Sequence, residues 1–472
     1  MPWDDKEHYL APDADEPSTC LSEADPCNPA TGNVTLDEID ISDNLGIGFS
    51  RHYQSRGLGE FGRSIGINWS HSYSAQMYAI PDDADLPNQP VSRSGSYSSP
   101  EDACLSGWAE LSEQSHGGTL NGATAVFYNG LCQIERAGAV KATLPIRIVN
   151  PYGPVQARSY LTHTITRANG QRYHFAAVNG SWVSNENKMA KLNANGTRWN
   201  LTLSDGTIEE YSEYGRITKK TDAQGRVTTY NYNIDAKLSQ VTGPFGQTLT
   251  FEYIDEKLSR VIGPDGAVRY QYDDHDNLIQ VIYPDGNSRH YLYEDSLYPH
   301  LLTGLVDEND NRIATWEYDD QGRVVMNERA NGTEHYEFTY NSDGTTAVVD
   351  GAGATRLYQF EVVDGKRKLV EVTGDRCDHC SHGDDQARAY DENGYIESAT
   401  DWNGHVTSFT RDEQGHELQR IEAAGTDDAR SITTEWHADF NKPVRITEPD
   451  RITEFVYDDK GRLLSKTERP AP

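Results

Sequence analysis

The stretch LIQVIYPDGNSRHYLY at residues 278–293 shows the unit from which the second half of the chain is built. Its first six residues are apolar and rich in β-branched side chains, which favour a strand. Pro284-Asp285-Gly286-Asn287 predicts a turn, because Pro presets φ at the first central position and Gly tolerates the left-handed conformation. The residues from Ser288 to Tyr293 alternate as in a second strand. The stretch therefore predicts a β-hairpin.

This hairpin recurs about every twenty residues. An aromatic residue, usually followed by an acidic or amide residue, ends each copy, at Tyr232, Tyr253, Tyr272, Tyr293, Tyr318, Tyr340, Tyr390 and Tyr457. The successive spacings are 21, 19, 21, 25 and 22 residues and then 50 and 67, with Phe409 and Trp436 marking weaker copies inside the wide gaps. A single hairpin is marginal in water, so the copies are expected to pack side by side.

Stacked hairpins place their aromatic residues on one face of a shared sheet. Tyr270 and Tyr272 lie two positions apart, so both are expected on the same side of their strand. The buried hydroxyls then require polar partners, and the abundant Asp, Asn and Thr residues are the expected ones. The fold class predicted is all-β, with repetitive antiparallel hairpins forming a continuous curved or spiralling sheet, an open partial shell.

Composition and charge limit the function. Hydrophobic residues make up only 36% of the 472, but 27 Tyr and 8 Trp provide apolar surface for a core. The chain carries 42 basic and 74 acidic residues, a formal charge of −32. Such a surface repels phosphate backbones and anionic lipids, so neither nucleic acid nor a membrane is an expected partner. A cationic partner remains open, and solubility alone is sufficient reason for the acidity.

The first half has a different pattern and divides the chain into four parts. We expect an extended or disordered tail over 1–24, a β-rich N-terminal domain over 25–80, an irregular β-rich connection over 81–190 and the repeat array over 191–472. The N-terminal domain should contain strands near 34–41, 47–53 and 67–73. In the connection, Ser99-Pro100-Glu101-Asp102 resembles a helix start and predicts a short helix near 100–112 with Leu105, Trp108 and Leu111 on one face.

The pattern Tyr-Asp-x-x-Gly-Arg occurs at 318–323 and at 457–462, with relatives at 222–226 and 390–395. These residues resemble the RHS/YD-repeat family of bacterial proteins. The segment that runs from DPCNPATGN at residue 25 to SHSY at residue 73 resembles the uncharacterised domain that commonly precedes such arrays. Together the resemblance covers nearly all of residues 25–472.

The resemblance implies a spiralling sheet that forms a hollow shell, which holds a C-terminal toxin or presents an adhesive surface. The expected partners are therefore a toxin cargo domain or further repeats, together with a secretion-system or surface partner. The chain ends at Pro472 without the family's self-cleaving segment or toxin domain. Residues 191–472 hold at most about fourteen repeats, fewer than the family's shells use, so an open, curved segment is expected.

Two sequence patterns match catalytic motifs by letters alone. Residues 57–62 satisfy G-x-G-x-x-G and residues 62–66 satisfy G-x-S-x-G. Both motifs require a helix directly after the turn, whereas Ile67 to Tyr73 alternate as a strand. His71, between Trp69 and Tyr73, is expected to be a packed core residue without an acid–base role. No catalytic constellation is expected, and the chain is not expected to be an enzyme.

The segment Cys377-Asp378-His379-Cys380-Ser381-His382 contains the one candidate metal site. A Cys-x-x-Cys pair lets two thiolates reach one tetrahedral ion, and His382 or His379 could provide a third ligand. The candidate ligands of a structural zinc ion are thus Cys377, Cys380 and His382, with a fourth ligand from elsewhere. A thiol or disulfide loop is the alternative, and Cys20, Cys27, Cys104 and Cys132 could pair in an oxidising compartment.

Three functional hypotheses follow. The first is a structural scaffold or partial shell segment of the type that encloses or displays a polymorphic toxin cargo in bacterial competition. The second is a cell-surface adhesin-like module whose exposed Tyr and Trp residues stack on sugars or bind protein. The third, an enzyme, lacks a visible site. The expected location is secreted or on the surface of a bacterium, although residues 1–10 (MPWDDKEHYL) show no signal peptide.

Overall fold

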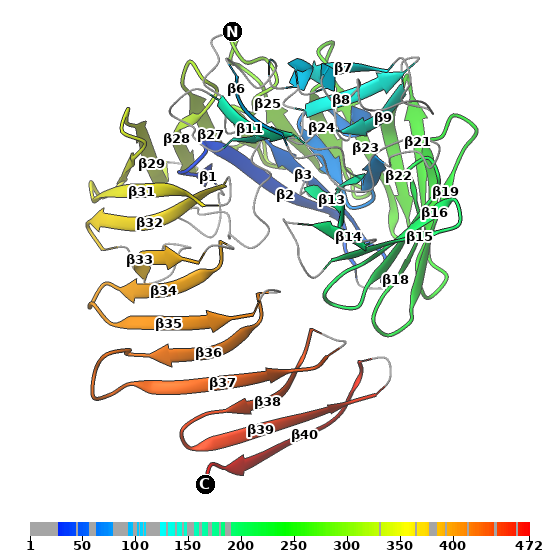
Figure 1. Cartoon of the computed structure of the whole chain (residues 1–472). Helices are drawn as coiled ribbons and strands as arrows, with labels where there is room; N and C mark the ends of the chain where they lie inside the picture. Colours follow the sequence, from blue (N-terminus) through cyan, green and yellow to red (C-terminus); the bar gives the residue numbers. More distant parts are fainter. Residues whose placement is uncertain are drawn as a thin grey trace.

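The computed structural model describes residues 27–43, 46–55, 63–78, 93–97, 102, 104–106, 108–109, 123–128, 131–136, 139–143, 146–148, 155–159, 163–168, 172–178, 181–184 and 190–472 except 330–331, 364–365, 377–384, 392–393, 413–414, 439–440 and 459–460. These residues are almost entirely β-strand (Figure 1). One short helix lies within 102–109, as predicted, and a 3-10 turn spans Arg63–Ile65. No helix in the described part is long and apolar enough to span a bilayer.

A front sheet of four strands opens the described chain, in the order β1-β2-β3-β4. Its strands match the three expected ones and add a short first one: β1 (Cys27–Asn28), β2 (Asn33–Ile41), β3 (Phe49–Gln54) and β4 (Trp69–His71). Two small sheets follow, made of β6 (Arg93–Tyr97), β10 (Ile146–Ile148) and β11 (Val155–Ser159), and of β7 (Thr124–Tyr128), β8 (Leu131–Arg136) and β9 (Ala139–Thr143).

The principal sheet has thirty antiparallel strands, β5 (Gln76–Tyr78) and then β12 to β40 in chain order. Each strand from β12 to β39 is hydrogen-bonded to a neighbour on both edges. β40 pairs only with β39 among the described strands, so the sheet is a continuous open ladder. Its first half consists of β12 (His163–Thr166), β13 (Arg172–Val178), β14 (Ser181–Ser184), β15 (Lys191–Asn195), β16 (Arg198–Thr202), β17 (Ile208–Tyr211), β18 (Ile217–Thr221), β19 (Val227–Tyr232), β20 (Leu238–Thr242), β21 (Thr248–Ile254), β22 (Lys257–Gly263), β23 (Gly266–Tyr272), β24 (Leu278–Ile282), β25 (Ser288–Leu292) and β26 (Gly304–Val306).

The second half of the sheet continues the ladder to Pro470. In Figure 1 the green, yellow, orange and red strands follow one another around a curve. Its strands are β27 (Arg312–Tyr318), β28 (Val324–Arg329), β29 (Thr333–Tyr340), β30 (Thr346–Asp350), β31 (Thr355–Val363), β32 (Lys366–Gly374), β33 (Asp385–Tyr390), β34 (Ile396–Asp401), β35 (Val406–Arg411), β36 (Glu417–Glu422), β37 (Arg430–Trp436), β38 (Pro443–Thr447), β39 (Arg451–Tyr457) and β40 (Leu463–Pro470).

The hairpin predicted at 278–293 is present as β24 and β25. Gly286 has a φ of 92°, the left-handed conformation expected of that turn. The turns after the YD aromatics use a further device, in which an aspartate accepts two backbone N–H groups. Asp319 Oδ1 accepts the N–H of Gln321 and of Arg323, each at 2.9 Å, and Arg323 Nε donates to Asp319 Oδ2 at 2.8 Å. The Asp and the Arg of the motif therefore fix the turn.

The tyrosine of the motif also has a repeated role. A β-bulge directly precedes this aromatic in most copies, as between Glu317 and Tyr318. The hydroxyl then donates to a main-chain carbonyl of the preceding hairpin. The bonds are Tyr232 to Ile217 (2.9 Å), Tyr272 to Leu258 (2.7 Å), Tyr318 to Leu302 (2.7 Å), Tyr340 to Val324 (2.6 Å), Tyr390 to Leu369 (2.7 Å) and Tyr457 to Pro443 (2.9 Å). The expectation of Asp, Asn and Thr partners is wrong for these hydroxyls, because the bulge aims each ring at the neighbouring backbone.

We predict that Tyr318→Phe lowers the free energy of unfolding by about 1–3 kcal/mol, because it removes the donor for a buried carbonyl. Tyr214→Phe is the control, since the Tyr214 side chain is 70% exposed. It should change stability by less than about 0.5 kcal/mol. Urea unfolding followed by fluorescence measures both variants, and equal effects would contradict the role assigned to the hydroxyl.

The first strand of the ladder, β5, contacts the ladder at a second place, the turn between β17 and β18. Met77 N donates to Gly215 O at 2.8 Å, and Gln76 forms an isolated antiparallel β-bridge with Arg216. A Cβ on Gly215 would lie 1.6 Å from Met77 O, so only glycine fits at this contact. The contact holds β5 against the eighth strand of the ladder and completes one turn of the curved sheet.

Gly215→Ala should therefore open this contact. Gly225 is the matched control, because it has nearly the same φ, 79° against 75°, and a Cβ there meets nothing within 4 Å. Gly225→Ala should cost about 1–2 kcal/mol from the left-handed backbone alone. We expect Gly215→Ala to cost about 1–3 kcal/mol more, because Met77 must move. Thermal unfolding of the two variants measures the difference, and equal losses would show that the contact contributes nothing.

One detail of the predicted helix is wrong. Cys104 and Trp108 are buried, and Trp108 Nε1 donates to Ala123 O at 3.1 Å. Leu105 is exposed, so the buried face passes through 104 and 108 and not through 105. Leu111 lies outside the described residues. Cys104 is disulfide-bonded.

Candidate functional site

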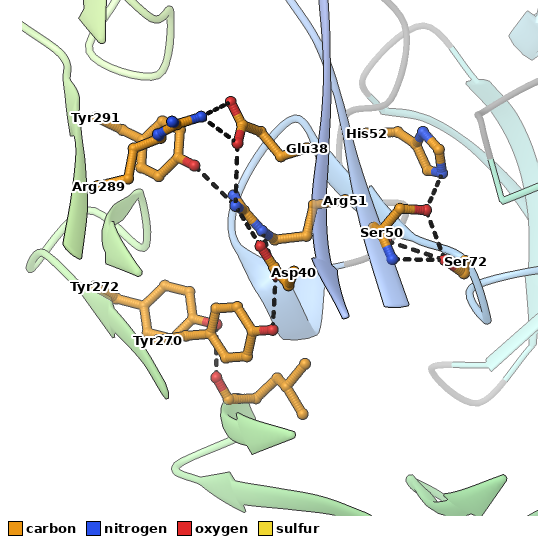
Figure 2. A network of polar contacts seen from close by, with 11 residues as sticks. Glu38, Asp40, Ser50, Arg51, His52, Ser72, Tyr270, Tyr272, Arg289 and Tyr291 are labelled. Atoms are coloured by element: carbon orange, nitrogen blue, oxygen red, sulfur yellow. Dashed lines mark hydrogen bonds and ion pairs between the residues drawn. The ribbon is translucent and has the colours of Figure 1, made fainter. Parts of the chain in front are cut away.

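A cluster of buried charged side chains lies between the front sheet and the repeats (Figure 2). Alternate residues of β2 and β3 face the repeat sheet, which curves around them. Arg51 of β3 is fully buried, and its Nε and Nη2 donate to the two oxygens of Asp40 at 2.7 and 2.8 Å. Arg51 Nη2 also donates to Tyr291 Oη of β25 at 2.8 Å, and Tyr270 Oη of β23 donates to Asp40 at 2.8 Å.

A second ion pair extends this cluster. Arg289 Nη1 donates to both oxygens of Glu38 at 3.0 and 2.8 Å, and Arg289 Nη2 donates to Glu308 at 2.9 Å. The Arg51 guanidinium lies 5.0 Å from the ring centroid of Trp69 and 5.2 Å from that of Tyr291. We call Glu38, Asp40, Arg51, Arg289, Tyr270 and Tyr291 the charge cluster. Its two carboxylates and two guanidiniums balance, which is the condition for burying them.

Burial and charge act in opposite directions on these groups. Burial alone would lower the pKa of Arg51, but the carboxylate of Asp40 holds it well above its ordinary value. Burial raises the pKa of Glu38 although Arg51 and Arg289 lie beside it. Neither guanidinium is placed to transfer a proton, and the tyrosines of the cluster have raised pKa values because they are buried. The geometry is that of a structural joint.

Aromatic contacts surround the charge cluster. Phe49 packs against Phe251 and Tyr270, with ring centroids 5.9 and 6.1 Å apart. His71 stacks on Phe49 at 5.2 Å, and its Nδ1 accepts the N–H of Tyr73 at 3.2 Å. Burial lowers the pKa of His71 to about 3, which keeps the ring neutral. His71 is thus a packed core residue, as expected from its aromatic neighbours.

Residues 27–33 form a second joint, at the β1 edge of the front sheet. Asn327 Nδ2 donates to the buried thiol of Cys27 at 3.1 Å, and Thr346 Oγ1 donates to Pro29 O at 2.8 Å. Gly32, with a φ of 70°, accepts from Val324 N at 3.0 Å. Cys27, proposed from sequence as a disulfide candidate, is therefore a thiol contact to β28. This joint connects residues about 300 positions apart.

The other candidate residues give no site in the described part. Cys377, His379, Cys380 and His382 lie in 377–384, outside the described residues. Elsewhere in the described chain, no group of three His, Cys, Asp or Glu side chains could hold a metal ion. Structural zinc at Cys377, Cys380 and His382 stays a prediction: native mass spectrometry of zinc-loaded protein should show one bound ion, which Cys377→Ser removes. Absence of that ion from the unmutated protein would contradict it.

The two motif-like patterns are not followed by helices. Residues 57–62 of the glycine-rich pattern lie outside the described residues. Arg63–Ile65 form a single 3-10 turn, and β4 begins at Trp69. A helix N-terminus that could bind phosphate or support a nucleophile is therefore missing after Ser64, as the strand pattern predicted.

Comparison with known proteins gives two matched segments, one over the front sheet and one over part of the repeat array. Residues 24–87 match a family model described as a domain of unknown function (DUF6531), and residues 257–359 match the Teneurin YD-shell model. No curated protein sequence matches the chain. Both joints connect the first of these segments to the repeats, and their partners on the repeat side, Tyr270, Arg289, Tyr291 and Asn327, lie within the second matched range.

Solved toxin structures are similar over part of their length. The Photorhabdus luminescens Tc holotoxin pore chain is 11% identical over 73% of this chain and 24% of that chain, with a TM-score of 0.41. The TcdB2-TccC3 structure is 13% identical over 95% of this chain and 25% of that chain, with a TM-score of 0.40. The chain thus spans about a quarter of these chains' length. The similarities are weak, whereas the repeats and the YD-shell match are specific.

Proposed function

Because the chain is an RHS/YD-repeat protein, we propose that its sheet is a segment of a shell wall that encloses or displays a protein cargo of the polymorphic-toxin type. The protein's role is that of a scaffold. Its expected setting, a secreted or surface-bound bacterial assembly, belongs to the same proposal. Its partners would be a cargo domain, further repeats and a secretion or surface component.

The uninterrupted ladder is the observation that carries this proposal. Among the described residues, every strand from β12 to β39 is paired with a neighbour on both edges, although β14–β15 and β32–β33 are paired at a single position each. A wall of this kind confines its contents without any chemical step. The two joints hold the front sheet inside the curve, and they therefore fix the distance between distant parts of the wall.

The inner face changes character where the front sheet no longer covers it. In β19–β21 the facing residues are Tyr230, Val241 and Leu249, which are all buried. The same register positions in β33–β35 are Arg388, Ala399 and Thr407. A more polar inner face suits water or a folded cargo surface better than it suits a packed core. This contrast supports an accessible interior along the later repeats.

The adhesin hypothesis requires aromatic side chains at the surface. Several tyrosines of the array point into the core instead, with Tyr211, Tyr291 and Tyr358 at 0–2% exposure. A glycan array probed with the protein should accordingly show no signal. Specific glycan binding would favour the adhesin over the scaffold.

The scaffold proposal is tested by attaching a protease-sensitive cargo domain after Pro472. Confinement by the wall should slow trypsin cleavage of the cargo by at least about tenfold relative to the free domain, because cleavage then follows opening of the wall. The same fusion carrying Gly215→Ala gives the cleavage rate of the cargo when the contact between β5 and the β17–β18 turn is opened. Equal cleavage rates for attached and free cargo would overturn the enclosing role.

A further inference from the structure

The front sheet carries a second polar cluster on the face that points away from the charge cluster. Ser50 and His52 flank Arg51 in β3, so they project to the opposite side. Asp37 lies directly across from His52 in the β2–β3 pairing. Figure 2 shows Ser50, His52 and Ser72 beside one another on this side of the strand. None of these residues contributes to the joints described above.

Close polar contacts connect Asp37, His52 and Ser50 in a row. His52 Nδ1 lies 2.6 Å from Asp37 Oδ1, and His52 Nε2 lies 3.4 Å from Ser50 Oγ. When the Nδ1–H donates to Asp37, the Nε2 lone pair faces the serine hydroxyl. Ser72 Oγ accepts the N–H of Ser50 at 2.8 Å, and its own hydroxyl can donate to Ser50 Oγ at 2.7 Å or to Ser50 O at 3.3 Å. When Ser72 donates to Ser50 Oγ, the Ser50 hydroxyl can donate to His52 Nε2.

A cavity of about 480 Å³ adjoins Ser50 and Ser72. Its lining residues include the apolar Ile41, Ile47 and Phe49 and the charged Asp43, Lys220, Asp222 and Arg226. The volume lies within the range of small-molecule sites, and Ile41, Ile47 and Phe49 give a short acyl chain an apolar surface to contact. The cavity lies where the front sheet meets β18 and β19, so it exists only in the assembled chain.

We propose that Ser50, His52 and Asp37 form a nucleophilic site that hydrolyses small acyl esters whose acyl group enters this cavity. Ser50 Oγ attacks the ester carbonyl while its proton passes to His52 Nε2, and the ester C–O bond breaks as His52 protonates the leaving alcohol. Water then attacks the acyl-serine, His52 takes its proton and returns one to Ser50 Oγ, and the carboxylic acid leaves. The sum is ester plus water giving acid plus alcohol.

The chain contains an internal comparison for this proposal. Ser288 Oγ and His290 Nε2 of β25 are also 3.4 Å apart, in the same Ser-x-His spacing. Within the described residues, His290 has no carboxylate hydrogen-bonded to its Nδ1, and Ser288 does not line the cavity. The spacing alone is therefore common to two strands. Asp37 and the cavity distinguish Ser50.

A fluorophosphonate probe tests the proposal in the intact chain, because it labels activated serines covalently. Peptide mass spectrometry should find the label on Ser50 and not on Ser288, and Ser288→Ala should leave the labelling rate unchanged. His52→Ala should slow labelling of Ser50 by about a hundredfold, the lower end for a positioned general base. Asp37→Asn should cause a smaller loss, because the exposed carboxylate only orients the ring.

Hydrolysis of p-nitrophenyl butyrate provides the second measurement. Ser50→Ala should remove the activity above the buffer rate, while Ser288→Ala retains it. Equal labelling of Ser50 and Ser288 in the unmutated protein would overturn the proposal without any variant having to fold. Ester hydrolysis that persists in Ser50→Ala would also overturn it. Neither result bears on the scaffold role, which does not use these residues.

Discussion

Arg51→Ala should lower the free energy of unfolding by about 3–5 kcal/mol, the cost of leaving one member of a buried ion pair without the other. Among the described side chains, Asp40 would keep the Tyr270 hydroxyl as its hydrogen-bond donor. The Asp40 side chain is fully buried, so water cannot replace the guanidinium. The contacts of the guanidinium with Trp69 and Tyr291 would also be lost. Urea unfolding, followed by the fluorescence of the buried Trp residues, measures the effect.

Arg451→Ala is the control for this prediction. Arg451 pairs with Glu448 in the last repeats, but its side chain is 51% exposed. An exposed pair of this kind contributes little to stability because solvent screens it, so the control should be nearly neutral. Since Arg51 joins the front sheet to β25, we also expect its loss to make β2 and β3 exchange amide hydrogens faster. Similar stability losses for the two variants would show that the charge cluster does not hold the joint.

The repeating part of this fold could be predicted from sequence because its determinants are local. A β-branched run, a Pro-Asp-Gly-Asn turn and an alternating strand specify β24 and β25 within sixteen residues. The regular spacing then implies that neighbouring hairpins share a sheet. The three strands of the front segment were predicted for the same reason, to within two residues at most ends.

The joints could not be predicted, because their partners are far apart along the chain. Arg51 and Tyr291 are 240 residues apart, and Cys27 and Asn327 are 300 apart. Nothing in the local pattern of β3 specifies that Arg51 faces a buried carboxylate instead of water. The sequence does offer one signal: Glu38, Asp40 and Arg51 occupy strand positions whose parity matches the apolar residues Leu36 and Phe49. Charged residues on the core face of a strand indicate a buried pair.

The Ser50 cluster was missed for a related reason. Asp37 and His52 become neighbours only through the register of the β2–β3 pairing, which contains a bulge between Ile39 and Ile41. A shift of one residue would place the carboxylate on the other face. The G-x-S-x-G pattern requires a serine on a turn that is followed by a helix, and that geometry does not apply to a serine in the middle of a strand.

A second large effect is expected on acidification, because two histidines are buried in the neutral form. His163 lies between Trp182 and Trp199, with ring centroids 4.2 Å away on each side, and burial lowers its pKa to about 3. His71 is buried among Phe49 and Tyr73, and burial lowers its pKa to about 3 as well. In the unfolded chain each imidazole should titrate near its ordinary value of about 6.5. Below that pH the unfolded state therefore binds protons that the folded state does not.

The direction in which stability changes with pH follows from this difference in bound protons. Stability contributed by the neutral rings is fully present above about pH 6.5 and is lost as the pH falls toward 3, at about 1.4 kcal/mol per pH unit for each ring. Going from pH 7 to pH 5 should thus cost about 4 kcal/mol for the two rings together. Glu38, whose pKa is raised by burial, acts in the opposite direction, because its folded form binds a proton at a higher pH than its unfolded form. Asp307, whose pKa is lowered by the N–H groups of Asn311 and Asn309, contributes stability that is lost only below about pH 4.

Urea unfolding at pH 7, 6 and 5 measures the slope, and His163→Phe separates the two rings. The variant should lose about half of the pH dependence whatever its own stability at pH 7, because one titrating group has been removed. His275→Gln is the control, since His275 lies exposed in the turn between β23 and β24. Its slope should equal that of the unmutated chain. A stability that stays constant between pH 7 and pH 5, or a His163→Phe slope equal to the original, would show that the buried rings do not control the acid response.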